Sequence, residues 1–564
     1  MTLTSALEAV ANRTSGHGIR LLRGERTTAR LSFDQLYEEA GRIACGLLDR
    51  GVLPSQRVAL ALPSAIDFAR AFFGVLAAGA VPVPVPPPFR FASLQIHMRR
   101  IEVILRQSQV RTVLTNKTLG DAMAAELGGT GSGPVSVLGV GELLAGSPIY
   151  NNVSPEHPAL AQYTSGTVTE PKGVVLSHAN LLANVDSISR ALDCADTDVC
   201  CTWLPLFHDM GLIGAFLCAV LNDIELCMLP PEDFLRDPGR WVRMISNFRG
   251  SISPAPNSAY LQTMRRVPAD MICNLDLSSW RLALTGAETV DAKVLREFSA
   301  HFAPAGFQAT AFLPVYGLAE GSLAVTFPPI GRPVQSIWVR RDLLSEGSVV
   351  VTHEGAEFAR EVVSVGTPVT NTEIRLVAES GTVVPDGASV GEIEIRGDSV
   401  MRTYEGHQHP NASPNKDGWV STGDLGFQHD GELFIAGRKK EMIVVFGQNY
   451  YASDIESIAG GEPGVASHGV LAVGLPFADG EGLVLFVETR ETEPEARDEL
   501  VARVRFAVSN GLGVTPRDVI LVRRGKLPRT SSGKLQRGSI GLPYTECELA
   551  NVGAEAVSVG IKRQ

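Results

Sequence analysis

Short apolar runs alternate with helix-like segments in the N-terminal part of the chain, and this alternation constrains the fold more than any other feature. The runs of strand length are 58–62, 81–85 and 110–115, and the helix-like segments are 33–50, 66–78 and 94–108. Strands that alternate with helices form βαβ units, in which successive strands pair in parallel. The pattern therefore predicts a large N-terminal α/β domain with mainly parallel sheets.

The pattern changes near residue 437, where shorter elements follow one another closely. The expected elements are strand 442–446, a helix from Ser453, strands 466–473 and 483–488, helix 495–510 and strand 519–522. Ser453 and Glu456 have the spacing of a capping box, in which each side chain binds the other residue's backbone amide. We expect an N-terminal domain over 1–437 and a small α+β domain over 438–564.

The charge balance and the cysteine content exclude several classes of protein. The chain has 50 Lys and Arg residues against 61 Asp and Glu residues, a net charge of −11. Binding to nucleic acid depends on clustered basic residues that neutralise phosphates, so no nucleic-acid partner is expected. Eight cysteines in 564 residues, without a CxxC pair, are too few for a disulfide scaffold.

No segment has the properties of a transmembrane helix or a secretory signal. The apolar run 210–222 is shorter than the roughly 20 residues that span a bilayer. The uncharged run 71–89 ends in several prolines, which break helices. The N-terminus lacks a basic region followed by an apolar stretch, so we expect a cytoplasmic protein.

The segment 163–173 has the composition of a phosphate-binding loop. It lies between the strand-like runs 159–162 and 174–176. Backbone amides, hydroxyl groups and one lysine can together surround a polyphosphate, and the residues of this kind are Thr164, Ser165, Gly166, Thr167, Thr169 and Lys172. The segment is not a Walker A loop, because Pro171 and Gly173 stand where that motif has Gly and Ser or Thr. On composition alone, a polar β-turn is an equal alternative.

This segment resembles the ATP loop of the adenylate-forming (acyl-activating) enzymes, and further motifs of that family follow in family order. Val168 and Thr169 replace the Thr-Gly pair that is usual in the middle of the loop. The resemblance covers about residues 31–537. It implies ATP and Mg²⁺ as cofactors.

Two motifs are similar to the family's substrate and adenine sites. His208, in the apolar segment 203–212, would orient the substrate carboxylate or shield its charge, although a buried structural histidine is the alternative. The turn Gly286, Ala287 and Glu288 resembles the adenine-binding turn, and a simple turn at a strand end is its alternative.

The segment 316–320 resembles the part of the family's site where an aromatic ring stacks on adenine. Tyr316 would supply that ring, and Gly317, Leu318 and Ala319 would follow it in the nucleotide pocket. Glu320 would hold Mg²⁺, a hard cation that prefers oxygen ligands.

Four residues of the second half complete the resemblance. Asp424 would accept both ribose hydroxyls, Arg438 would contact phosphate or ribose, and Lys440 would be the hinge between the domains. Lys534, in the loop 527–534, resembles the catalytic lysine that neutralises the α-phosphate. The family first joins a carboxylate to AMP with release of pyrophosphate. It then transfers the acyl group to a nucleophile, usually a thiol.

The connection 328–363 is longer than in the family's CoA ligases and resembles the insertion of the fatty acyl-AMP ligases. The segments 363–366 and 446–456 also resemble that branch, in which Asn449 stands where CoA ligases usually carry Arg and Ala452 replaces a usual Pro. The resemblance implies a fatty acid substrate and an acyl carrier protein as acceptor, with CoA disfavoured. The alternative is that residues 328–363 are merely an elaborated surface loop.

The acyl chain would lie near Leu212, Ile213, Phe216, Pro256 and Asn257, although apolar residues there are equally expected in a core. Seven basic residues between 517 and 537 could attract an acidic carrier protein or the phosphates of CoA, or form a solvated face. The sequence therefore predicts a fatty acyl-AMP ligase. An acyl-CoA ligase and a non-catalytic acyl- or nucleotide-binding relative are the alternatives.

Overall fold

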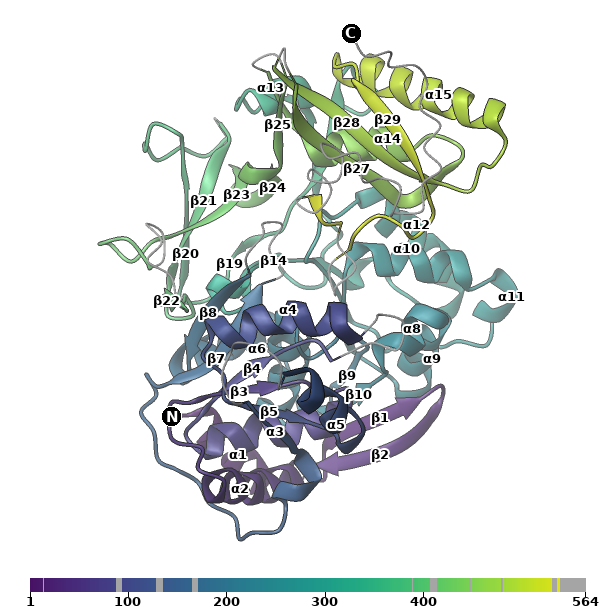
Figure 1. The fold of residues 1–564 in the computed structure, drawn as a ribbon. Coiled ribbons are helices and arrows are strands. Elements are labelled where there is room, and N and C mark those ends of the chain that lie inside the picture. Colours follow the sequence, from purple (N-terminus) through teal and green to yellow (C-terminus); the bar gives the residue numbers. More distant parts are fainter. Residues whose placement is uncertain are drawn as a thin grey trace.

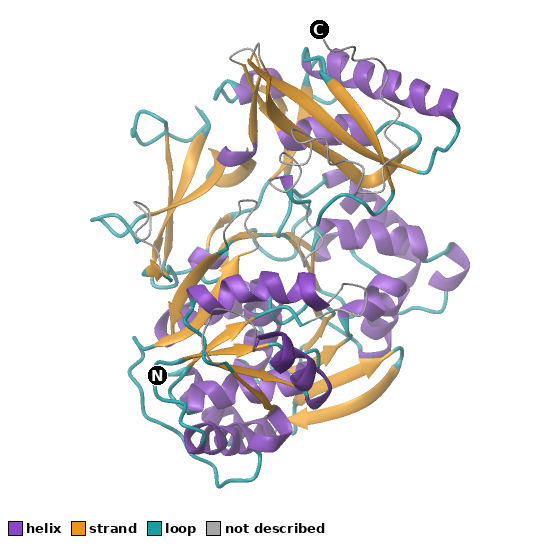
Figure 2. Ribbon diagram, in the orientation of Figure 1, coloured by secondary structure: helices purple, strands orange, loops and turns teal. Residues whose placement is uncertain are grey.

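The computed structural model describes residues 1–13, 15–87, 94–127, 135–164, 171–387, 389–405, 413–445, 448–477, 480–529 and 535–537. The N-terminal sheets and their helices lie at the bottom of Figure 1, and the C-terminal elements lie at the top. Figure 2 shows how helices cover the central sheets.

The first βαβ units form a parallel sheet with the strand order β4-β3-β5-β6. Its strands are β3 (Arg57–Leu60), β4 (Val81–Pro84), β5 (Thr112–Thr115) and β6 (Ser136–Gly139). The helices of this region are α2 (Phe33–Asp49), α3 (Ala65–Ala77), α4 (Leu94–Gln107) and α5 (Lys117–Leu127). The predicted strands and helices are confirmed here to within two residues at each end.

A second, seven-stranded sheet has the order β13-β12-β11-β9-β10-β1-β2, and only its β1–β2 pair is antiparallel. Its strands are β1 (Gly18–Arg23), β2 (Arg26–Ser32), β9 (Val199–Thr202), β10 (Glu225–Met228), β11 (Ile252–Ala255), β12 (Leu282–Thr285) and β13 (Phe312–Pro314). The helices of this part include α6 (His178–Ala191), α7 (Cys218–Leu221), α8 (Pro231–Arg236), α9 (Gly239–Phe248), α10 (Asn257–Arg266), α11 (Ala269–Ile272) and α12 (Ala292–Phe302). The predicted α/β class is confirmed.

Smaller antiparallel sheets surround these two and carry most of the predicted motifs. They comprise β22-β8-β7, β14-β15-β19, β17-β16-β18 and β20-β21-β23-β24. Their strands are β7 (Pro158–Thr164), β8 (Lys172–Ser177), β14 (Tyr316–Gly317), β15 (Ala324–Phe327), β16 (Ser336–Arg340), β17 (Val351–Thr352), β18 (Ala359–Val363), β19 (Thr367–Pro368), β20 (Thr372–Val377), β21 (Gly391–Gly397), β22 (Thr403–Tyr404), β23 (Val420–His429) and β24 (Glu432–Arg438).

The C-terminal elements have their own apolar cores, built around Ile455, Leu485 and Val504 on one side of a sheet and around Leu471 and Phe486 on the other. The elements are β25 (Met442–Val445), β26 (Gln448–Tyr451), α14 (Ala452–Gly460), β27 (Val465–Phe477), β28 (Gly480–Thr489), α15 (Pro494–Leu512) and β29 (Asp518–Arg523). The expected strands and helices are present, and the domain boundary at residue 437 stays a proposal.

The predicted capping box at Ser453 is wrong. Helix α14 begins at Ala452 after Tyr451, so Ser453 already lies inside the helix. Glu456 accepts a hydrogen bond from the backbone amide of Ala472 (3.0 Å) and another from Arg537 (2.7 Å). The Glu456 carboxylate, which the capping pattern assigned to the helix N-terminus, is therefore bonded to residues outside the helix.

Among the described residues, no helix combines the length and the apolar composition needed to cross a membrane.

The N-terminal helix α1 (Leu3–Ala11) is attached to the domain through His178, which is buried and accepts a hydrogen bond from the Leu3 amide (3.1 Å). Burial lowers the pKa of His178 to about 4, and the neighbouring His157 adds to this effect. Only a neutral imidazole can accept this hydrogen bond.

We expect the free energy of unfolding to fall as the pH drops from 6.5 towards 4. The folded-state pKa of His178 lies below its unfolded value, so the unfolded chain binds the proton more tightly in that range. The full loss would be about 3 kcal/mol, at 1.36 kcal/mol per pKa unit. Urea unfolding at pH 7.5 and 5 measures it, and His178→Gln should reduce the difference between the two values. An equal pH dependence in both proteins would contradict the assignment.

Candidate functional site

The predicted phosphate loop falls between β7 and β8, which pair as a hairpin with Thr164 opposite Lys172. Ser165, Gly166, Thr167 and Thr169 lie outside the described residues, and so does the side chain of Thr164. Lys172 is described, and its ammonium lies 4.9 Å from the ring centroid of Tyr404.

Tyr163 anchors this hairpin to the first parallel sheet. Its hydroxyl accepts a hydrogen bond from Ser108 (2.8 Å) and donates one to Glu405 (3.3 Å), which also pairs with Arg57 of β3. The described part of the hairpin is thereby connected to the first parallel sheet.

Glu320 lies in a short helical turn, residues 319–321, that follows β14. The carboxylate accepts a hydrogen bond from the Tyr404 hydroxyl (2.7 Å), and burial raises the pKa of Glu320. The turn itself requires glycine at position 317, because a Cβ there would lie 1.8 Å from the carbonyl oxygen of Leu323.

Among the described residues there is no cluster of three or more His, Cys, Asp and Glu side chains that could hold a metal ion. Glu320 supplies carboxylate oxygens, the ligand type that Mg²⁺ prefers. Its chemistry therefore fits the role predicted for it, which would be to hold the Mg²⁺ of a bound nucleotide.

Tyr316, Asp424 and Arg438 come from three different strands and meet in one hydrogen-bonded group. The buried Asp424 carboxylate accepts one bond from the Tyr316 hydroxyl (2.8 Å) and another from the Arg438 guanidinium (2.9 Å). Asp424 in turn raises the pKa of Arg438. Each carboxylate oxygen has a further lone pair, so Asp424 keeps the capacity to accept hydrogen bonds from a diol.

The turn after β12 contains the predicted adenine residues. Ala287 adopts a left-handed conformation with φ = +67°, and a Cβ on Gly286 would lie 2.8 Å from the carbonyl oxygen of Val315. The Glu288 carboxylate accepts a hydrogen bond from the amide of Ser258 in the first turn of α10. Glu288 therefore stabilises the N-terminus of that helix, a structural role that the motif did not indicate.

His208 follows β9 and is half-buried, with Nδ1 3.9 Å from a carboxylate oxygen of Asp209. The preceding carbonyl, that of Phe207, accepts a hydrogen bond from the buried Gln162 (3.0 Å). The chain then enters a π-helix, Met210–Leu217, an uncommon element that is frequent at functional sites.

An apolar cavity lies beside Phe207 at the ends of β4, β9 and β10. Leu62, Ala65, Phe68, Leu206 and Met228 contribute to its wall, and Glu232 is the charged residue among those that line it. The predicted acyl-binding residues do not line this cavity. Leu212, Ile213 and Phe216 are fully buried in the main core, and Pro256 and Asn257 begin α10.

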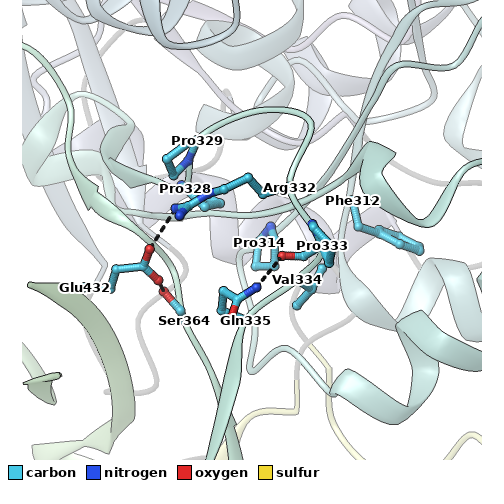
Figure 3. A pocket seen from close by; sticks show the side chains of 10 residues that line it. All are labelled: Phe312, Pro314, Pro328, Pro329, Arg332, Pro333, Val334, Gln335, Ser364 and Glu432. Atoms are coloured by element: carbon cyan, nitrogen blue, oxygen red, sulfur yellow. Dashed lines mark hydrogen bonds and ion pairs between the residues drawn. The ribbon is translucent and has the colours of Figure 1, made fainter. Parts of the chain in front are cut away.

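A second hollow lies at the base of the insertion 328–363, and none of the predicted site residues lines it (Figure 3). Arg332 binds Glu432 there (2.9 Å), and Ser364 donates a hydrogen bond to the same carboxylate. These contacts attach the insertion to β24.

Lys440 and the residues next to Lys534 belong to the C-terminal part. The positive charge of Lys440 contributes, after burial, to lowering the pKa of Lys172, while Glu320 opposes that shift. Lys440 therefore lies close enough to Lys172 for the two charges to interact.

Lys534 lies outside the described residues, but the chain on both sides of it is paired. Arg529 forms a β-bridge with Leu535, and Arg537 binds the carboxylates of Glu441 and Glu456, each at 2.7 Å. Seven basic residues between 517 and 537 could form a solvated face. Two of them, Arg529 and Arg537, form ion pairs.

The motifs did not identify Tyr404, Glu405 or His468. Tyr404 and Glu405 contact residues that lie 84 and 242 positions away, respectively. His468 has φ = +51°, and its pKa is lowered by burial and raised by Glu288, so β27 lies near the Glu288 turn. None of the three belongs to a local pattern that a sequence could reveal.

Comparison with known proteins gives a consistent set of relatives. A family model described as "AMP-binding enzyme" matches residues 7–405. A Caulobacter vibrioides protein with an acyl-CoA synthetase name is 33% identical over 96% of this chain and 95% of its own length. A medium-chain-fatty-acid–[acyl-carrier-protein] ligase from Moorena producens is 32% identical over 93% of this chain and 92% of its own length.

One of the similar solved structures comes from a study of fatty acyl-adenylate ligases from E. coli and L. pneumophila. It superposes with a TM-score of 0.90 at 31% identity and covers 97% of this chain and 98% of its own.

Proposed function

Because this chain belongs to the AMP-binding enzyme family, we propose that it is an ATP-dependent fatty acyl-AMP ligase that passes its acyl group to the phosphopantetheine thiol of an acyl carrier protein. The proposal rests on one observation, which is that residues far apart in the sequence are in contact. Tyr316, Asp424 and Arg438 form one hydrogen-bonded group, and Glu320 and Lys172 meet at Tyr404.

In the first half-reaction, a carboxylate oxygen of the fatty acid attacks the α-phosphorus of ATP. The bond to the β-phosphate breaks, and pyrophosphate leaves. We assign the ribose hydroxyls to Asp424, with Arg438 beside it. Lys172 and Lys534 neutralise the charge that develops on the phosphates, and His208 lies beside the substrate carboxylate. Mg²⁺ held by Glu320 would neutralise further phosphate charge. The catalysis thus consists of positioning and electrostatic stabilisation.

In the second half-reaction, a thiolate attacks the acyl carbonyl carbon and AMP leaves. Lys534 has no role in this step, so the small domain would rotate at Lys440 and admit the acceptor. The names of relatives support both a carrier protein and CoA as acceptor, and the insertion 328–363 favours the carrier protein. A cytoplasmic location stays a prediction.

Mass spectrometry of the products tests the proposal. The purified protein is incubated with ATP, Mg²⁺, a series of fatty acids and CoA. We expect acyl-AMP to accumulate without acyl-CoA, and thioester to form only after a holo-carrier protein is added. Rapid formation of acyl-CoA would identify an acyl-CoA ligase instead. ATP binding without pyrophosphate release would indicate a non-catalytic relative.

The apolar cavity beside Phe207 supports an aliphatic substrate and leads to a prediction. Ala65→Phe should place a larger side chain in the cavity, so that only shorter acyl chains fit. We expect kcat/KM for long-chain acids to fall about tenfold while that for short acids stays within about threefold, because each lost methylene contact is worth roughly 1 kcal/mol or more. Pyrophosphate release with acids of increasing length measures this effect.

Leu53→Phe is the matched control, since Leu53 is exposed and lies away from the cavity. An unchanged length preference in Ala65→Phe would show that the acyl chain lies elsewhere.

A further inference from the structure

The residues just before the undescribed segment 406–412 are attached to the strand that carries Lys172. In β22, Tyr404 pairs with Val174 of β8, and the amide of Glu405 donates to the carbonyl of Gly173 (2.7 Å). The two strands lie side by side in Figure 1. The backbone position of Tyr404 is therefore determined by the phosphate-loop hairpin.

The Tyr404 side chain contacts two opposite charges. Its hydroxyl donates a 2.7 Å hydrogen bond to Glu320, and its ring face lies 4.9 Å from the Lys172 ammonium. Only 8% of the residue is exposed, so the Tyr404 side chain is largely shielded from water. A hydrogen bond to an ionised acceptor and a cation–π contact are both strengthened there.

These two contacts use different parts of one side chain. The ring attracts a cation through its negatively polarised face, whereas the hydroxyl orients a carboxylate. The Tyr404 side chain therefore contacts the Glu320 carboxylate and the Lys172 ammonium at the same time, each through a different group.

We propose that Tyr404 is a positioning residue of the ATP site, which orients Glu320 towards the divalent cation and Lys172 towards the phosphates. The inference rests on the proposed function, because that function gives Glu320 and Lys172 their roles. Tyr404 itself lies outside the motifs that the sequence predicted.

Two substitutions separate the two contacts. Tyr404→Phe keeps the ring and loses only the hydroxyl, whereas Tyr404→Leu loses both. ATP affinity is measured by calorimetry with Mn²⁺ and again with EDTA, and electron paramagnetic resonance reports Mn²⁺ binding to the protein–ATP complex. Tyr450→Phe serves as the control, since its hydroxyl contacts Gln448 at an exposed position.

We expect Tyr404→Phe to weaken Mn²⁺-dependent ATP binding roughly five- to tenfold and to leave metal-free ATP binding within about twofold. Tyr404→Leu should weaken both. Added to Glu320→Gln, Tyr404→Phe should have no further effect, because the hydroxyl acts through that carboxylate.

If Glu320→Gln weakens Mn²⁺-dependent binding and Tyr404→Phe does not, the inference is overturned while the role of Glu320 stands. Additive effects of the two substitutions would overturn it as well. If Glu320→Gln itself has no effect, the role of Glu320 in the proposed function is overturned together with the inference.

Discussion

Lys534→Ala is expected to lower the rate of acyl-adenylate formation by at least about a hundredfold. The attacking carboxylate and the α-phosphate are both negatively charged, so removing one preorganised positive charge from a site of this kind costs roughly 10²- to 10³-fold in rate. Pyrophosphate release and ATP–pyrophosphate exchange measure the effect. ATP affinity and the free energy of unfolding should change little, because Lys534 acts in the transition state.

Lys526→Ala provides the control for this experiment. Lys526 belongs to the same basic segment and is exposed, so its loss removes the same charge at a different place. A general effect of the basic segment would lower both rates, whereas the proposed role affects only Lys534→Ala. Near-normal pyrophosphate release from Lys534→Ala would contradict the assignment of the catalytic lysine.

The second large effect concerns the insertion 328–363, which we expect to disfavour CoA as acceptor. The insertion packs Val339, Leu344 and Val362 against Phe427 and Phe434 of the β23–β24 pair, in a cluster that also contains Tyr451. Removing residues 328–363, where the protein tolerates it, should raise the formation of acyl-CoA relative to acyl-AMP. An unchanged acceptor preference would show that the insertion does not determine which acceptor is used.

A buried ion pair offers a milder test of the same idea. Arg360 of the insertion binds Asp454 of α14 at 3.2 Å and donates to the carbonyl of Ala436 (2.9 Å), and both charged side chains are less than 10% exposed. Breaking the pair from one side, as in Asp454→Ala, should destabilise the protein by about 3–5 kcal/mol, since it leaves a buried charge unpaired. Urea unfolding measures this loss.

The double variant Arg360→Met, Asp454→Leu removes the pair without leaving a lone charge, so the fold should be retained. If the contact between the insertion and the small domain governs the acceptor, this variant should form more acyl-CoA than the unmodified protein. Exposed pairs such as Arg190 with Asp186 supply the control, with the same replacements. A fully stable double variant with unchanged acceptor preference would assign the effect to another part of the insertion.

The sequence by itself determined the secondary structure and the order of the functional segments. Apolar runs with strand and helix lengths placed β3, α3 and β5 to within two residues, because hydrophobic periodicity is a local property. The segments around Lys172, Glu320 and Asp424 were found through their resemblance to the motifs of a known family, which is visible because each motif has particular residue types at short spacing.

Only the tertiary structure decided which of these residues meet. The carboxylate of Glu456 binds Arg537 and the Ala472 amide instead of its own helix terminus, and Tyr404 joins Glu320 to Lys172. Leu212 and Phe216 became core residues, while the apolar cavity formed from part of the segment 203–212 together with segments that no motif marked. Such contacts join residues far apart in the chain, so they depend on how strands and helices pack, which no local pattern of residues encodes.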